Sequence, residues 1–210
     1  MTQWKKTTVG CPACLEDGEF TICSFIDIAE DPDLKESIFD RSLFRFTYPE
    51  CGEEILVSYS CTYFDSDNSF MVALIPEKDD SSLETDCYTL RIVRSINEFV
   101  EKIALMEDGI DDRIIELYKI MLEDQFEEER HGAEILGIYY SGQNSDTKSL
   151  LFYIITGNAE NCRAELSFDT YTAISGQLEG SAKFDESCTE INRLWAITAL
   201  QKGFLDEKEK

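Results

Sequence analysis

The stretch Cys11-Pro12-Ala13-Cys14 has a second, imperfect copy later in the chain, Tyr48-Pro49-Glu50-Cys51-Gly52. In the first copy, two cysteines separated by two residues fit one tight turn, from which both sulfurs can point at a single Zn²⁺. The second copy keeps the proline and the second cysteine and adds a glycine, but Tyr48 stands where its first cysteine would be. Two such turns, each opening onto a strand, predict a zinc ribbon that lacks one of its four cysteines.

The predicted metal ligands are Cys11, Cys14 and Cys51. A structural zinc site takes four ligands, so one position must be filled by water, by a carboxylate, or by Cys23 or Cys61 farther along the strands. Tyr48 is a poor substitute, because a phenol ionises only near pH ~10. Two interpretations stay open: zinc is retained with a substitute ligand, or zinc is lost and aromatic and apolar packing holds the ribbon. The missing cysteine favours a site that has decayed and needs no cofactor.

These motifs resemble those of the CpXC domain proteins, a bacterial and archaeal family without an established activity that is named for two CPxC motifs. The resemblance also includes Ala29-Glu30-Asp31-Pro32-Asp33-Leu34-Lys35, and it extends to Arg91-Ile92-Val93-Arg94 and to residues 111–116, so that it covers about residues 8–125. By this similarity, the three cysteines occupy three of the four family positions, and Tyr48 departs from the fourth. The resemblance implies a metal-binding or interaction module.

The remaining pattern predicts an α+β protein with a ribbon-like sheet over residues 1–76. Alternation over 20–28, and apolar runs over 43–47, 55–59 and 70–75, are typical of strands. A short helix is expected after Asp31-Pro32-Asp33, which offers an N-cap and a proline at the first position. Residues 77–86 are polar and charged, and they form the predicted linker.

A strand over 88–93 and a central helical pair over residues 95–128 should follow, the first helix capped by Ser95 and Glu98 and ended by Gly109. Asp111 and Asp112 then fit the first turn of the second helix better than a catalytic pair. The predicted C-terminal part contains antiparallel strands over 134–140 and 150–156, a third strand over 163–168, and a terminal helix from about residue 190 with Ile191, Leu194, Trp195 and Thr198 facing inward. We expect a CpXC-like domain at 1–130 and an α+β unit at 131–210.

The chain is strongly acidic, with 43 acidic and 19 basic residues and a formal charge of −24. Nucleic-acid affinity comes largely from Lys and Arg that displace counterions, so the charge argues against DNA or RNA as a partner. Anionic membrane surfaces are disfavoured for the same reason. The start of the chain has no apolar stretch of a secretory signal, and we therefore expect a cytoplasmic protein with reduced thiols and an unidentified protein partner.

No catalytic residue can be assigned, and the sequence favours a non-enzymatic structural or protein-interaction module. The alternative is thiol redox or zinc-dependent activity centred on Cys11 and Cys14. Redox dithiols place the first cysteine at a helix N-terminus, whereas a turn into a strand is expected here. His131, the one histidine, is expected at a helix C-terminus. The acidic stretches 65–68 and 77–80 lack the pattern of a calcium loop and are expected to be solvated turns.

Overall fold

A computed structural model describes residues 1–77, 85, 87–129, 134–157, 162–180 and 188–204. The chain is a mixed α+β protein, as the sequence predicts, and it forms two compact units, Met1–Ile103 and Ala104–Lys210. The predicted domain boundary at residue 130, His131 and nearly all of the predicted linker lie outside the described residues. Within the described parts of the chain, no helix combines the length and the apolar character needed to cross a bilayer.

The N-terminal unit is built on a five-stranded sheet with the order β1-β2-β5-β6-β7. Its strands are β1 (Gln3–Gly10), β2 (Asp17–Asp27), β5 (Cys61–Asp65), β6 (Phe70–Leu74) and β7 (Thr89–Val93). The pairs β2 with β5 and β6 with β7 are parallel, and the other two pairs are antiparallel. The predicted strands over 20–28, 70–75 and 88–93 are confirmed, whereas β1 and β5 were not identified from the sequence.

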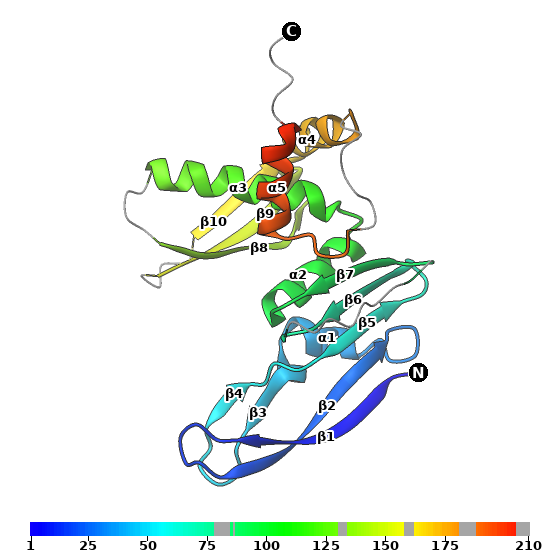
Figure 1. The fold of residues 1–210 in the computed structure, drawn as a ribbon, viewed down its shortest axis with the longest axis vertical. Helices are drawn as coiled ribbons and strands as arrows, with labels where there is room; N and C mark the ends of the chain where they lie inside the picture. The colour runs from blue at the N-terminus through cyan, green and yellow to red at the C-terminus, as the bar shows by residue number, and fades with distance from the viewer. Residues whose placement is uncertain (78–84, 86, 130–133, 158–161, 181–187, 205–210) are drawn as a thin grey trace. The chain divides into compact units, whose positions relative to one another are not determined.

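A second, short hairpin of the same unit consists of β3 (Arg45–Thr47) and β4 (Glu54–Leu56). It follows the predicted short helix, α1 (Leu34–Phe39), and a turn of 3₁₀ helix, η1 (Ser42–Phe44). The Phe46 ring lies 5.2 Å from the ring of Phe20 on β2, which joins the two hairpins through aromatic packing. In Figure 1 the β1–β2 and β3–β4 turns lie at the same end of the unit.

The start of α1 differs from the expected one. Asp33 occupies the N-cap position but has helical backbone angles, and its side chain makes no capping hydrogen bond. The sequence predicts Asp31 as the cap and Pro32 as the first helical residue, whereas the helix begins at Leu34, so the predicted cap is wrong although the helix itself is confirmed. By contrast, the predicted capping box at α2 (Ile96–Glu107) is present: Glu98 N donates to Ser95 Oγ over 3.2 Å, and Ser95 N donates to Glu98 Oε2 over 3.1 Å.

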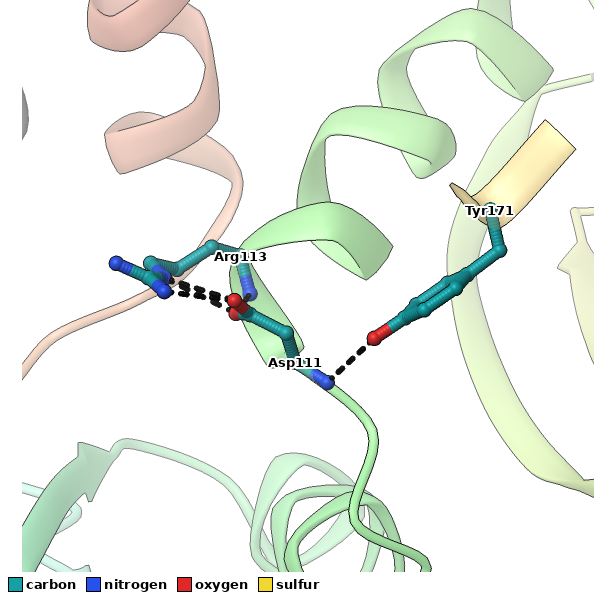
Figure 2. A network of polar contacts seen from close by, with 3 residues as sticks. All are labelled: Asp111, Arg113 and Tyr171. Carbon is teal, nitrogen blue, oxygen red and sulfur yellow. Dashed lines mark hydrogen bonds and ion pairs between the residues drawn. The ribbon is translucent and has the colours of Figure 1, made fainter. Parts of the chain in front are cut away.

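The second predicted helix is α3 (Asp112–Glu129), and Gly109 precedes it with a left-handed φ of 66°. Figure 2 shows how α3 begins: the Asp111 carboxylate accepts from the Arg113 backbone N–H over 2.9 Å and also binds the Arg113 guanidinium. The Asp111 N–H donates to the Tyr171 hydroxyl over 3.0 Å. Asp111 therefore caps α3 from just before its first residue, whereas the sequence predicts it in the first turn; the expected structural function is confirmed.

The C-terminal unit contains an antiparallel sheet in the order β10-β9-β8, with β8 (Ile135–Asn144), β9 (Ser149–Thr156) and β10 (Cys162–Ser167). The helices of this unit after the sheet are α4 (Phe168–Gly180) and α5 (Arg193–Ala199), which continues into a π-helical turn, η2 (Leu200–Phe204). One apolar core lies between α3 and the sheet and includes Ile115, Leu122 and Phe152. A second joins α3, α4 and α5.

Three details of this unit differ from the expectation. The strand β8 extends through Asn144, so the hairpin connection is shorter than predicted. Helix α4 was not predicted. The inward side of α5 is formed by Ala196 and Ala199, whereas Leu194 is 72% exposed and the predicted inward position of this leucine is wrong.

Candidate metal centre

The two Pro-x-Cys turns are copies of each other in backbone structure. In the first, Cys11 N donates to Glu16 O over 2.8 Å and Leu15 N donates to Cys11 O over 3.1 Å. In the second, Tyr48 N donates to Glu53 O over 2.8 Å and Gly52 N donates to Tyr48 O over 2.9 Å. The first turn joins β1 to β2 and the second joins β3 to β4, and each begins directly after the last paired residues of its hairpin. The internal repeat seen in the sequence is therefore a structural repeat.

The residue after the second cysteine of each turn has left-handed backbone angles. Leu15 has a φ of 65°, and Gly52 has a φ of 73°. Glycine adopts this region without the steric cost that a Cβ atom brings, so the second turn carries the residue that the geometry favours. The first turn carries leucine at the same position, with 84% of its surface exposed.

The two turns bring the sulfur atoms of Cys11, Cys14 and Cys51 within 4.8 Å of one another. The Sγ atoms of Cys11 and Cys51, which come from different hairpins, are 3.5 Å apart, and all three cysteines are free thiols. Sulfurs bound at about 2.3 Å in a tetrahedral zinc site lie about 3.8 Å from one another. The group could therefore hold a metal ion, and its spacing is compatible with zinc.

Tyr48, which takes the place of the fourth cysteine, is only 2% exposed. Its hydroxyl donates a hydrogen bond of 2.6 Å to the Gly10 carbonyl of the other turn. Its ring packs edge-on against Phe46 at 4.7 Å. A Cβ atom at Gly18, on β2, would come within 2.5 Å of the Phe46 ring and 3.3 Å of the Tyr48 ring, so both rings pack against the β2 backbone next to the first turn. Tyr48 thus links the two turns without a metal.

Comparison with known proteins agrees with this geometry. The family model described as CpXC protein matches residues 9–119, which is more than half of the chain and includes both turns. The chain belongs to the CpXC family. The strands and helices that follow residue 119 of this CpXC protein lie outside the match. No curated protein and no solved structure matches the chain significantly.

Cys23 and Cys61, which the sequence offers as a fourth ligand, do not join the CpXC group of Cys11, Cys14 and Cys51. Cys23 and Cys61 are both buried, on β2 and β5, and neither belongs to the sulfur group. Burial raises the pKa of Cys23 to about 11, and burial together with Cys23 raises the pKa of Cys61 well above its usual range. Both are therefore neutral core thiols. Among the described residues, no carboxylate or histidine completes the group either.

The thiols of the CpXC group influence one another. Burial acts to raise the pKa of Cys11, but hydrogen bonds from the Cys14 and Ala13 amides and from the neighbouring thiols outweigh it and lower that pKa. The Glu16 amide acts to lower the pKa of Cys14, but the interactions with Cys11 and Cys51 and burial raise it above the usual value. Because three adjacent thiolates repel one another, a cation would favour the ionised set.

The remaining candidates of the sequence analysis have structural functions or lie apart. Asp65 is buried, and its carboxylate accepts from Asn68 N over 3.0 Å and from Asn68 Nδ2 over 2.7 Å, so it caps the β5–β6 turn. The expectation of a solvated turn is wrong for this residue. Cys87 is exposed, and Cys162 and Cys188 are half-buried. Sequence reasoning missed Tyr48 as a link between the turns, since no local signal connects it with Gly10.

Proposed function

We propose that this CpXC protein is a non-enzymatic structural or protein-interaction module whose ribbon holds one zinc ion on Cys11, Cys14 and Cys51. The observation that carries the proposal is the convergence of three sulfurs from two matching turns to within 4.8 Å. Thiolate ligands favour zinc among the common divalent ions. A metal bound here would tie the β1–β2 hairpin to the β3–β4 hairpin, and its binding free energy would add to that of folding.

Each thiol of the site has a position that suits ligation. The Cys14 backbone N–H lies 3.5 Å from Cys11 Sγ, an arrangement that stabilises a thiolate. Cys11 is buried, whereas Cys51 is exposed and Cys14 is partly exposed, so an ion has a path to the sulfurs from the side of Cys51. The site is thus half enclosed by the two turns.

Zinc content is the direct test. Elemental analysis of tag-free protein, purified without chelators, should give about one zinc per chain for the wild type. The variant Cys51→Ser should lose the metal, and Cys87→Ser, which changes an exposed thiol outside the group, should retain it. Wild-type protein that contains no zinc and takes up none from a buffered zinc solution would contradict the proposal.

The alternative function is thiol redox activity at Cys11 and Cys14, and the lowered pKa of Cys11 favours it. A reactive dithiol gains from a helix N-terminus, however, whereas Cys11–Cys14 lies in the turn between β1 and β2. Catalysed reduction of a disulfide substrate that disappears in Cys14→Ser but survives in Cys51→Ser would favour this alternative. If Cys14→Ser loses zinc and the wild type shows no disulfide-reducing activity, the structural module is favoured.

A protein is the partner that the charge favours. With a formal charge of −24, the chain repels phosphate backbones, and we propose the helical pair and the C-terminal sheet as its contact surfaces. In a gel-shift assay at low salt, where electrostatic binding is strongest, we expect no complex with DNA or RNA. A salt-sensitive complex with either nucleic acid would overturn this part of the proposal.

A further inference from the structure

We propose that a metal ion on Cys11, Cys14 and Cys51 keeps an open fourth position, which takes a neutral nitrogen donor of the imidazole class in place of water. This inference rests on the proposed function, because it requires a metal on the three thiols. It goes further in naming the coordination state and the ligand chemistry of the site.

The protein supplies three ligands to the site. Within the described part of the chain, the sulfur group has three members and gains no fourth cysteine, histidine or carboxylate. A closed structural zinc site has four protein ligands, and a site with three keeps a position for water or another exchangeable donor.

Tyr48 does not fill that position. Its backbone is equivalent to that of Cys11, so its side chain starts where the fourth cysteine would start. The hydroxyl proton is donated to the Gly10 carbonyl over 2.6 Å, and the ring packs on Phe46 and above Gly18. A phenol that donates its proton to a carbonyl is not a phenolate, and only the phenolate is a good metal ligand.

The site is accessible from one side. Cys11 is 2% exposed, but Cys14 is partly exposed and Cys51 is exposed. Pro49, Glu50 and Gly52, which flank Cys51, are exposed as well. A small donor can therefore approach an ion from the side of the second turn.

Charge selects the kind of donor. A divalent ion on three thiolates has one excess negative charge, and the sequence has no Lys or Arg over residues 7–34 or 46–77. The basic residues that precede the two turns most closely in sequence are paired: Lys6 with Glu19 at 2.6 Å and Arg45 with Glu54 at 3.5 Å. An anionic ligand would meet repulsion from the site and its surroundings. A neutral imidazole avoids this repulsion and gives the Cys₃His type of donor set that zinc accepts.

The test replaces zinc by Co²⁺, whose spectrum reports its ligands. Thiolate ligation gives a charge-transfer band in the near ultraviolet, and the visible bands report the geometry. Titrations with imidazole and with azide are compared in the wild type, in Tyr48→Cys, which restores the fourth thiol, and in Tyr48→Phe, which keeps the ring but removes the hydroxyl.

We expect imidazole to shift the visible bands of the wild type and of Tyr48→Phe, with azide at least tenfold less effective. Tyr48→Cys should show closed tetrahedral bands that do not respond to imidazole. If imidazole does not shift the visible bands of the wild type although the charge-transfer band is present, the open position is overturned and the proposed function stands. A phenolate-to-Co²⁺ charge-transfer band in the wild type that Tyr48→Phe removes would overturn the open position too, since it would make the phenol a ligand. Absence of the charge-transfer band would overturn the proposed function itself.

Discussion

The variant Tyr48→Phe should weaken both the ribbon and its affinity for zinc. The substitution removes the hydroxyl that donates to the Gly10 carbonyl over 2.6 Å and keeps the ring that packs on Phe46. A hydrogen bond of this kind contributes about 0.5–1.5 kcal/mol. Gly10 is exposed, so water can replace the lost donor, and we expect a loss of about 1 kcal/mol in metal-free protein. If the bond also holds the sulfurs in place, the same free energy corresponds to an about fivefold weaker zinc affinity.

A second tyrosine provides a matched control. The hydroxyl of Tyr59 donates to the Leu43 carbonyl over 3.1 Å, within the same unit but away from the two turns. Both partners of this bond are buried, so water cannot replace the lost donor, and Tyr59→Phe should lower the free energy of unfolding by about 1–3 kcal/mol, at least as much as Tyr48→Phe does, and leave the zinc affinity unchanged. The contrast between the two variants separates a link between the turns from a general stabilising contact.

The assay uses the fluorescence of Trp4, which lies on β1 of the ribbon. A Trp195→Phe background removes the signal of the C-terminal unit, and urea unfolding of metal-free protein then gives the free energy. Zinc affinity is measured by competition with a chromophoric chelator. If Tyr48→Phe unfolds like the wild type, or binds zinc as tightly as Tyr59→Phe does, the hydrogen bond to Gly10 does not join the turns and the reasoning fails.

Leu15→Gly should raise the free energy of unfolding by about 1 kcal/mol, and Gly52→Ala should lower it by a similar amount, because both positions have left-handed backbone angles. Urea unfolding of both variants measures this, and a change of the same sign in both would contradict it. Burial raises the pKa of Cys23 from 9.0 to about 11. The stabilisation from its neutral thiol is therefore complete below pH 9.0 and is lost progressively as the pH rises to about 11. In Cys23→Ala, the free energy of unfolding should depend less on pH over this range. An alkylating agent should modify Cys51 in metal-free protein but not after zinc is added, and it should modify Cys23 only after unfolding, as detected by mass spectrometry. Modification of Cys51 at equal rates with and without zinc would count against ligation. Asp111→Ala should destabilise the C-terminal unit by about 1 kcal/mol through loss of the cap of α3, measured by urea unfolding followed by Trp195 fluorescence, with Asp111→Asn retaining most of the stability.

The parts of this fold that sequence reasoning could predict are those fixed by local chemistry. The capping box of Ser95 and Glu98 has a fixed spacing, and its two hydrogen bonds are present. The repeated Pro-x-Cys pattern likewise defines a turn in which a few backbone hydrogen bonds determine where the cysteine points. Because both turns follow the same rule, the three sulfurs could be identified as one group before the pairing of the strands was known.

The parts that could not be predicted depend on contacts between distant segments. Nearly all of β1 is exposed, so it lacks the apolar alternation that identifies a strand, and its pairing with β2 decides its structure. Helix α4 contains Thr170, Thr172, Ser175 and Gly176, which have low helix propensity, and it is stabilised by packing of Ile174 and Leu178 against the core with α3 and α5. Leu194 was assigned to the wrong side of α5 because small alanines, not the larger leucine, fit that core.

The loss of one cysteine therefore has a different meaning in the structure than in the sequence. In a site held together by metal alone, removal of a ligand would free the second turn, and the remaining sulfurs would separate. Here the turn is closed by its own backbone hydrogen bonds, and Tyr48 ties it to Gly10, so Cys51 Sγ stays 3.5 Å from Cys11 Sγ. The substitution removes a ligand and supplies a cross-link in the same step. A ribbon built in this way has no need of the metal to bring its thiols together, and for that reason it can leave one coordination position to an exchangeable ligand.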